Sequence, residues 1–301
     1  MTDIIIIGGG PAGLTAAIYA RRAGKSVLIL EKNGFGGQIT LSPKVENIPG
    51  FKEVTGAEFA DLLVEQALSQ GADCDIAEVL EIKDGPVKTV VTDNGEYEAK
   101  AIIIASGADH RRLGLPKEEE LIGAGISFCA VCDGAFYQDE VVGVVGGGNS
   151  ALQEALQLSA TSKKVVIFQD LDFLTGEAML QEELLKKENI EVHTGVRVCG
   201  YLGEDSLTGI QYQEHGGAVH EYPLSGLFLA VGLVPQNEPF TNVLELDERG
   251  YAKADEAMKS ESRGIFVAGD CRQKKIRQVA TAASDGAIAA LSACDFLDGR
   301  A

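Results

Sequence analysis

The sequence is short of positive charge. Its 301 residues include 26 lysines and arginines against 45 aspartates and glutamates, which gives a formal net charge of -19. Because phosphate backbones attract basic surfaces, this balance excludes a non-specific nucleic-acid binder. The short basic pairs that do occur, such as Arg21-Arg22 and Lys186-Lys187, are typical of solvated helix ends and loops.

Long apolar runs are also missing. Every apolar stretch is far shorter than the about 20 residues that a membrane-spanning helix needs, so no membrane association is expected. The first strand-like run, Ile4-Ile7, begins almost at the N-terminus, which leaves no room for a secretory leader. A cytoplasmic protein is therefore expected.

Cysteine and histidine are scarce. Of six cysteines only Cys129 and Cys132 are close in sequence, and the four histidines show no ligand spacing. A zinc site needs a second ligand pair, and a secreted disulfide framework needs a regular set of cysteines. The Cys-x-x-Cys therefore indicates a redox pair, with a zinc half-site and a chance occurrence as the alternatives, and no metal is predicted.

Glycine is abundant, and it is concentrated in two similar turns. Gly8-x-Gly10-x-x-Gly13 follows the apolar run Ile4-Ile7, and Gly146-x-Gly148-x-x-Ala151 follows Val141-Val145. A helical pattern and a second strand-like run come after each turn. Two copies of this pattern predict an α/β protein with two Rossmann-like domains.

Each glycine of the first turn has a physical role. Gly8 permits the tight turn, Gly10 allows the backbone to approach a pyrophosphate, and Gly13 allows helix and strand to pack closely. The start of the helix presents free N–H groups to the phosphates. Glu31, directly after the next strand, is placed to accept hydrogen bonds from an adenosine ribose.

Two polar, proline-bearing links divide the chain, at residues 111-120 and 235-242. Further strand-like runs lie at 101-105, 227-231 and 264-268, and an alanine-rich helix at 279-296 closes the chain. We therefore predict a first, discontinuous domain over residues 1-112 and 243-301. A second domain, residues 113-242, is inserted into it.

Several motifs occur together in a specific order. They are Gly8-Gly9-Gly10-Pro11-Ala12-Gly13, Gly36-Gly37-Gln38, Val45-Glu46-Asn47-Ile48-Pro49-Gly50, Cys129-Ala130-Val131-Cys132-Asp133-Gly134, Gly146-Gly147-Gly148-Asn149-Ser150-Ala151, and Ala268-Gly269-Asp270 with Arg277-Gln278. Through them the chain resembles the low-molecular-weight thioredoxin reductases over nearly its whole length. The resemblance implies two FAD/NAD(P)-binding domains of the three-layer ββα type, a homodimer and a second domain that rotates.

The resemblance also implies that the first domain binds FAD. Gln38 and Asn47 would lie near the flavin, Asp270 would hold the ribityl chain, and Arg277, Gln278 and Val279 would face the flavin ring. The full set expected to bind FAD is Gly8, Gly10, Pro11, Ala12, Gly13, Glu31, Gly37, Gln38, Asn47, Gly107, Gly269, Asp270, Arg277, Gln278 and Val279.

By the same resemblance Cys132 receives electrons from the flavin, and Cys129 attacks the disulfide of a thioredoxin-like protein. Asp133 adds a carboxyl beside the pair, and partial burial there would raise its pKa so that it delivers a proton to a leaving thiolate. In the family an aromatic pair after the cysteines contacts thioredoxin. Here Ala135 replaces the first aromatic of that pair, ahead of Phe136 and Tyr137.

The second turn is expected to bind a nicotinamide dinucleotide through Gly146, Gly148, Asn149, Ser150, Ala151, Gln169 and Asp170. NADPH enzymes of the family carry His-Arg-Arg and a later arginine after the next strand. Gln169, Asp170 and Leu171 stand there instead, with Phe173, or Thr175 in a shifted alignment, at the later position. With no guanidinium to pair a 2′-phosphate, we expect NADH, with NADPH and ferredoxin as alternative donors.

The predicted function is a flavin-dependent disulfide reductase of the thioredoxin reductase type. Electrons pass from the donor through FAD to Cys132-Cys129 and on to a thioredoxin-like disulfide. The alternatives are a ferredoxin-dependent thioredoxin reductase, a flavin-dependent thiol oxidase that uses oxygen, and a flavin-binding regulator without turnover.

Overall fold

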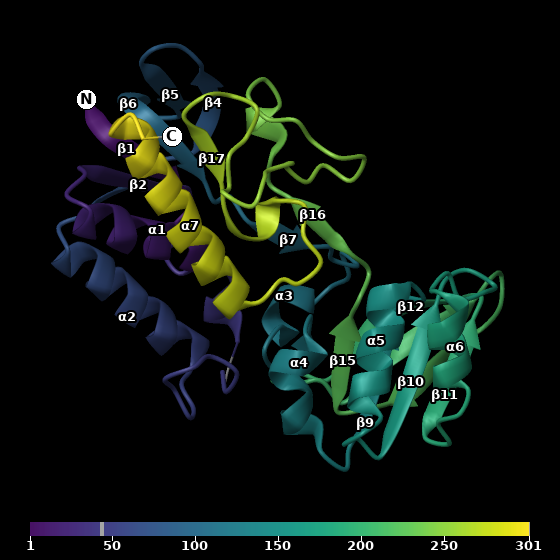
Figure 1. Cartoon of the computed structure of the whole chain (residues 1–301). Coiled ribbons are helices and arrows are strands. Elements are labelled where there is room, and N and C mark those ends of the chain that lie inside the picture. Colours follow the sequence, from purple (N-terminus) through teal and green to yellow (C-terminus); the bar gives the residue numbers. More distant parts are fainter. Residues whose placement is uncertain (43–44, 301) are drawn as a thin grey trace. The chain divides into compact units, whose positions relative to one another are not determined.

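The computed structural model describes residues 1-42 and 45-300, and these form two compact units (Figure 1). The first unit comprises Met1–Asp109 and Val234–Ala301, and the second comprises His110–Leu233. Both units are α/β, with parallel strands and helices in alternation, so the predicted fold class is confirmed.

The first unit is built on a sheet of seven strands among the described residues. Their order is β3-β2-β1-β6-β5-β4, and β17 pairs with β6. Strands β1, β2, β3, β6 and β17 run parallel, whereas β4, β5 and β6 form an antiparallel ribbon. The bounds are β1 Thr2–Ile7, β2 Val27–Glu31, β3 Asp73–Ile76, β4 Val79–Lys83, β5 Lys88–Thr92, β6 Gly95–Ile104 and β17 Ile265–Val267.

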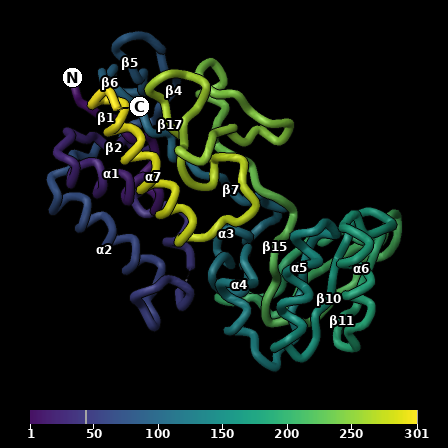
Figure 2. Tube along the Cα trace, in the orientation of Figure 1, coloured from purple at the N-terminus to yellow at the C-terminus, as the bar shows by residue number. Residues whose placement is uncertain are grey.

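The apolar run of β1 is buried on both faces because the sheet has a layer on each side. Ile4 and Ile6 pack with helices, and Ile5 and Ile7 pack with the β4-β5 ribbon and the segment after Phe240. The helices are α1 Pro11–Arg22, α2 Gly56–Ser69 and α7 Val279–Leu297, with the 3₁₀ turns η1 Gly37–Leu41, η3 Glu238–Phe240 and η4 Gly269–Cys271. Helices α1 and α7 lie side by side (Figure 2).

The second unit repeats this plan. Its parallel sheet has the order β11-β10-β9-β15-β8, and an antiparallel sheet β12-β13-β14 covers one face. Helices α4, α5 and α6 cover the other face. The bounds are β8 Ile126–Ser127, β9 Val141–Val145, β10 Lys164–Gln169, β11 Ile190–Thr194, β12 Val196–Leu202, β13 Gly209–Glu214, β14 Val219–Pro223, β15 Gly226–Leu229, α3 Glu118–Leu121, α4 Ala130–Asp133, η2 Gly134–Tyr137, α5 Asn149–Leu158 and α6 Ala178–Leu184.

The chain passes between the units through two short strands that pair with each other, β7 Ala108–His110 and β16 Leu233–Pro235. The sequence placed these crossings at 112/113 and 242/243, and the units divide at 109/110 and 233/234. The segment after Pro235 belongs to the first unit because Asn237 is buried there and donates to the carbonyl oxygens of Gly250 and Cys271. Phe240 joins the core of the same unit.

Candidate functional site

The first glycine turn joins β1 to α1 in a geometry that only glycine tolerates. Gly8 has a φ of +107°, and a Cβ there would meet the carbonyl oxygen of Ala105. A Cβ at Gly13 would overlap the Gly8 carbonyl oxygen, so the helix can approach the strand only without a side chain at this position. Pro11 and Ala12 open the helix, whose N-cap Gly10 has no side-chain cap.

The uncapped start of α1 is suited to a phosphate group. Its first N–H groups have no partner inside the helix, and a Cβ at Gly10 would meet nothing closer than 3.8 Å. Glu31 lies beside the turn, where its Oε2 accepts from the Gly9 N–H at 2.7 Å and its Oε1 accepts from Asn33 at 3.1 Å. The turn and the carboxylate together fit the pyrophosphate and ribose of a dinucleotide.

A second glycine pair closes over this turn. The Gly36 N–H donates to the Gly9 carbonyl at 2.8 Å, and a Cβ at Gly37 would lie 3.0 Å from the Gly10 Cα. Gln38 follows on η1, and its Nε2 donates to the Ala108 carbonyl at 2.6 Å. Gly37 is thus brought to the turn formed by Gly8 to Gly13, whereas the side chain of the adjacent Gln38 contacts β7.

The residues expected near the flavin ring come together at the start of α7. Gln278 is the N-cap of α7 and accepts from Asn47 Nδ2 at 3.2 Å, although the two residues lie far apart in sequence. Val279 is the first residue of the helix. The Arg277 guanidinium lies over the Tyr251 ring at 4.1 Å, and its Nε donates to the Asp270 carbonyl at 3.3 Å.

Gly269 and Asp270 lie on η4, directly after β17. Gly269 has a φ of +81°, and a Cβ there would lie 2.8 Å from the Ala12 Cβ, so η4 packs on the start of α1. Asp270 Oδ1 is buried and receives no hydrogen bond, although Lys274 Nζ lies 3.1 Å away as an ion pair. Gly107, with a φ of +73°, accepts from the Gln236 N–H through its carbonyl oxygen, and its backbone also interacts with Cys271 of η4.

Cys129 and Cys132 form a disulfide at the start of α4, with their Cα atoms 5.3 Å apart. Both residues are half-buried, and Val131 between them is exposed. The Cys132 N–H donates to Cys129 Sγ at 3.2 Å. A backbone donor at this sulfur favours negative charge there once the disulfide is opened.

Asp133 shares a hydrogen-bond chain with the cysteines through Ser127, a residue that the sequence analysis missed. The Ser127 hydroxyl donates to Asp133 Oδ2 at 2.6 Å and accepts from the Cys129 N–H at 3.2 Å. Burial raises the pKa of Asp133, and the Ser127 hydrogen bond partly offsets this effect. Its Oδ1 is buried with no hydrogen-bond partner among the described residues, as suits a carboxyl that carries a proton.

The second glycine turn joins β9 to α5 and copies the first in its geometry. Gly146 has a φ of +125°, and a Cβ there would lie 2.6 Å from the Ala230 carbonyl oxygen. Gly148 is the N-cap of α5 and has no side-chain cap, so the N–H groups of Asn149 and Ser150 begin the helix as those of α1 do. Ala151 is fully buried against the sheet.

Gln169 and Asp170 lie at the end of β10, next to this turn. The Gln169 side chain is buried against Gly147, where a Cβ would lie 2.6 Å from its Cδ, and its Nε2 donates to the Phe173 carbonyl. Asp170 is exposed, and one of its oxygens lies 3.1 Å from His215 Nε2.

The loop at 170-177 folds back onto the second turn, which the sequence did not predict. The N–H groups of Thr175 and Gly176 both donate to the Gly147 carbonyl, at 2.8 and 2.9 Å. Asn149 Oδ1 accepts from the Glu177 N–H at 2.7 Å, and its Nδ2 donates to the Glu177 carboxylate at 2.9 Å. A carboxylate therefore stands beside the start of α5. A bound pyrophosphate would be repelled by it.

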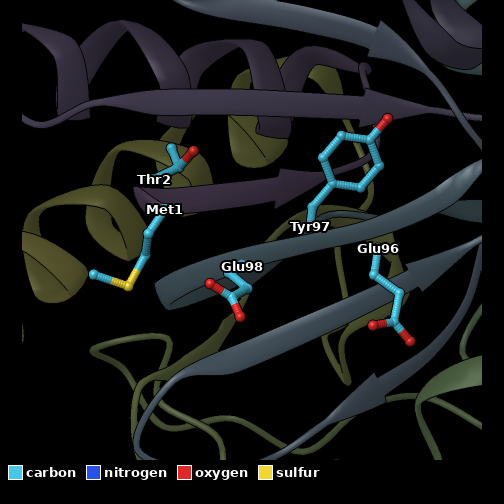
Figure 3. Close-up of a pocket in the computed structure, with 5 residues that line it drawn as sticks. All are labelled: Met1, Thr2, Glu96, Tyr97 and Glu98. Atoms are coloured by element: carbon cyan, nitrogen blue, oxygen red, sulfur yellow. The ribbon is translucent and has the colours of Figure 1, made fainter.

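A surface pocket elsewhere on the first unit contains none of the predicted site residues (Figure 3). It is lined by Met1, Thr2, Glu96, Tyr97 and Glu98, where β1 begins beside the first half of β6. The carboxylates of Glu96 and Glu98 in its lining disfavour a phosphate-bearing ligand.

The described part of the chain, residues 1-42 and 45-300, lacks two kinds of feature. No helix in this part of the chain is long and apolar enough to cross a membrane. No group of three or more His, Cys, Asp or Glu residues is arranged there to hold a metal ion.

Comparisons with known proteins agree with this geometry. The family model described as "Pyridine nucleotide-disulphide oxidoreductase" matches residues 2–286. The chain is 40% identical over 299 residues to a "Thioredoxin reductase" of Listeria monocytogenes, which covers 98% of this chain and 94% of the relative. It is also 40% identical over 301 residues to the "34.2 kDa protein in rubredoxin operon" of Clostridium pasteurianum, which covers 99% of this chain and 98% of the relative.

A solved structure gives the same result. The thioredoxin reductase from Streptococcus pyogenes MGAS5005 matches with a TM-score of 0.94 and 37% identity over 99% of each chain. Since the family model spans most of the sequence and the relatives match over nearly their full length, the chain belongs to the pyridine nucleotide-disulphide oxidoreductases and, within them, to the thioredoxin reductases, and it is an oxidoreductase that acts on a sulfur group.

Proposed function

We propose that the chain is a flavin-dependent thioredoxin reductase, which reduces the disulfide of a thioredoxin-like protein. The observation that carries this proposal is the Cys129–Cys132 disulfide in the unit that also holds the second dinucleotide turn. FAD, when bound, supplies two electrons at a time to that disulfide. We also propose a homodimer and a cytoplasmic location, on the strength of the family.

The first unit is proposed to hold FAD by both of its ends. The start of α1 and Glu31 suit the pyrophosphate and the adenosine ribose, and the buried Asp270 Oδ1, which is ion-paired with Lys274, keeps capacity to accept a hydrogen bond from a ligand hydroxyl group. Gly10 and Gly37 face each other, and a Cβ on either would lie 3.8 or 3.0 Å from the Cα of the other, so the two backbone segments pack closely beside the start of α1. Binding of FAD to purified apoprotein, followed by flavin absorbance, tests this part of the proposal directly.

The two cysteines take different roles. Reduction of the disulfide by two electrons and two protons yields two thiols, and Cys129, whose sulfur accepts the Cys132 N–H, is the one stabilised as a thiolate. This thiolate attacks one sulfur of the partner disulfide and forms a mixed disulfide, which the Cys132 thiolate then resolves. Asp133, held by Ser127, protonates the thiolate that leaves the partner.

The experiment is a trapping assay. With Cys132→Ser, Cys129 is expected to form a stable mixed disulfide with oxidised thioredoxin, visible as a band of the summed mass on a non-reducing gel. With Cys129→Ser the band should be absent. If both single variants trap thioredoxin equally, or neither does, the assigned roles are wrong. Reoxidation of the reduced flavin by air faster than by oxidised thioredoxin would favour a thiol oxidase instead.

We propose NADH as the electron donor. The Asp170 carboxylate at the end of β10 suits a free ribose 2′-hydroxyl and repels a 2′-phosphate, and Gln169 beside it brings no positive charge. A second candidate is a donor that does not bind this turn, such as reduced ferredoxin. It is favoured by the Glu177 carboxylate at the start of α5 and by the loop contacts on Gly147.

Anaerobic stopped-flow bleaching of the flavin separates the donors. NADH, NADPH and reduced ferredoxin are supplied in turn at equal concentration, and the rate of loss of flavin absorbance is recorded. Fastest bleaching by NADH supports the role given to Asp170. Fastest bleaching by NADPH contradicts it, and bleaching by ferredoxin alone identifies the second candidate.

A further inference from the structure

Asp270 is in contact with a group of buried charged side chains that has no role in the proposed electron transfer. Lys274 Nζ stands 3.1 Å from Asp270 Oδ1 and 3.1 Å from Asp285 Oδ2. The side chains of Lys274 and Asp285 are only 8% and 7% exposed. Burying a lysine costs free energy unless it is paired, so its place between two carboxylates has a structural purpose.

Asp285, on α7, gathers the loop that carries Asp270. Its Oδ2 accepts from the Gly269 N–H at 3.1 Å, from Arg272 Nε at 2.8 Å and from Lys274 at 3.1 Å. Its Oδ1 accepts from a second nitrogen of Arg272 at 3.2 Å. One carboxylate thus fixes the backbone of η4 and both cations that follow it.

The next residue of α7 connects this loop to the first glycine turn. A Cβ at Gly286 would overlap the Ala12 carbonyl oxygen, so α7 and α1 touch backbone to backbone at this point. Gly269 also packs on Ala12. Asp285 and Gly286 therefore hold together the two parts of the flavin site that lie at opposite ends of the sequence.

The Asp270 carboxyl depends on Lys274 for its charge. Burial raises the pKa of Asp270, and the opposing effect comes first from Lys274 and then from Arg277. The other charged and titratable groups that act on it or feel it are Asp285, Tyr251 and Cys271. A buried carboxyl without its cation takes up a proton. A protonated carboxyl has less capacity to accept hydrogen bonds from the hydroxyl groups of a ligand.

We propose that Lys274 is a positioning residue of the flavin site, which keeps the Asp270 carboxylate ionised as the acceptor for the hydroxyl groups of the FAD ribityl chain while Asp285 anchors Lys274 in place. This inference rests on the proposed binding of FAD. It assigns a role to Lys274 and Asp285 through Asp270, and neither residue touches the reacting atoms.

The test measures FAD affinity rather than turnover. Apoproteins of the parent, Lys274→Met, Lys274→Arg and Lys275→Met are titrated with FAD at pH 6 and pH 8, and binding is followed by quenching of flavin fluorescence. Lys275 is the exposed neighbour of Lys274 in the same loop. Lys275→Met therefore removes one positive charge but leaves the ion pairs of Lys274 with Asp270 and Asp285 intact. Thermal unfolding of each apoprotein reports its stability separately.

We expect Lys274→Met to weaken FAD binding about tenfold or more at pH 6, as loss of a charge-assisted interaction would. Part of the affinity should return at pH 8, because Asp270 then ionises without its cation. Lys274→Arg should bind FAD within a few-fold of the parent, and Lys275→Met should match the parent at both pH values.

Three results would overturn the inference. They are parent-like binding by Lys274→Met, an equal loss at pH 6 and pH 8, and a failure of Lys274→Arg to restore binding despite a parent-like unfolding temperature. If the parent and Lys275→Met themselves fail to bind FAD, it is the proposed cofactor that is wrong. If Lys274→Met does not fold, Lys274→Gln, which keeps a hydrogen bond but not the charge, takes its place in the comparison.

Discussion

Glu154, in the middle of α5, is a half-buried residue whose carboxyl has one buried oxygen without a hydrogen bond in the described part of the chain. Its Oε2 is buried and has no hydrogen-bond partner among the described residues. It lies one helical turn before Leu158 on the same face of α5. The Leu158 side chain packs against Gly134, where an added Cβ would lie 3.1 Å from it. Burial raises the pKa of Glu154 from 4.5 to about 8. We predict that Glu154→Gln stabilises the protein at neutral and alkaline pH.

The sign follows from the direction of the shift. Between pH 4.5 and about 8 the folded protein keeps the proton on Glu154, whereas the unfolded chain releases it. Folding therefore takes up a proton in this range, and the free energy of unfolding falls as the pH rises. One pKa unit corresponds to about 1.4 kcal/mol, so the penalty is on the order of 3 kcal/mol at pH 7 and is absent below pH 4.5.

The assay is urea unfolding of the parent and Glu154→Gln at pH 5 and pH 8, followed by circular dichroism. Both should have similar stability at pH 5, and the variant should be more stable by about 2 to 4 kcal/mol at pH 8. Glu182→Gln, at an exposed position of α6, is the matched control and should leave the difference between the two pH values unchanged. If Glu154→Gln shows the same pH dependence as the parent, the carboxyl is ionised in the folded protein and the reasoning fails.

Three further predictions concern the reaction and the cofactors. Ser127→Ala removes a hydrogen bond that lowers the pKa of Asp133, so the pH profile of thioredoxin reduction should move to higher pH. An unchanged profile would mean that Asp133 does not transfer the proton. Gly286→Ala places a methyl group against the Ala12 carbonyl and should lower the free energy of unfolding by about 1 to 3 kcal/mol. It should also bind FAD more weakly than the control Ser284→Ala, whose position is exposed. Parent-like stability and FAD binding would mean that α7 can shift to make room for the methyl group. Thr175→Arg adds a guanidinium to the loop on the second turn and should raise flavin bleaching by NADPH relative to NADH about tenfold; an unchanged ratio would mean that this loop does not select the donor.

Local patterns predicted the parts of the fold that depend on short-range physics. The run at 141-145 is β9 as predicted, and the closing helix was predicted within one residue of its end at Leu297. The helices were expected only after each glycine turn, yet α1 begins at Pro11 and α5 at Asn149, inside the glycine motifs themselves. The antiparallel strands β12, β13 and β14 were not singled out, since half-exposed strands with mixed polarity give a weak signal.

The predicted site was recovered to different degrees. The glycines, Glu31 and the cysteine pair carry their chemistry in their spacing, and the assignment to the thioredoxin reductases and to disulfide reduction is confirmed. The role of each site residue and the choice of donor stay predictions. Ser127, Lys274 and Asp285 were missed because single polar residues have no pattern, and only their partners reveal them.

By itself, the sequence determined the two strand–turn–helix repeats, the acidic surface and the redox pair, because these follow from residue type and spacing along one short segment. Only the tertiary structure decided which distant residues meet. It brought Gln278 to Asn47, placed Lys274 between two carboxylates, and set Glu177 at the start of α5. Such pairings depend on how helices and sheets pack, and packing is a property of the whole chain rather than of any local stretch of it.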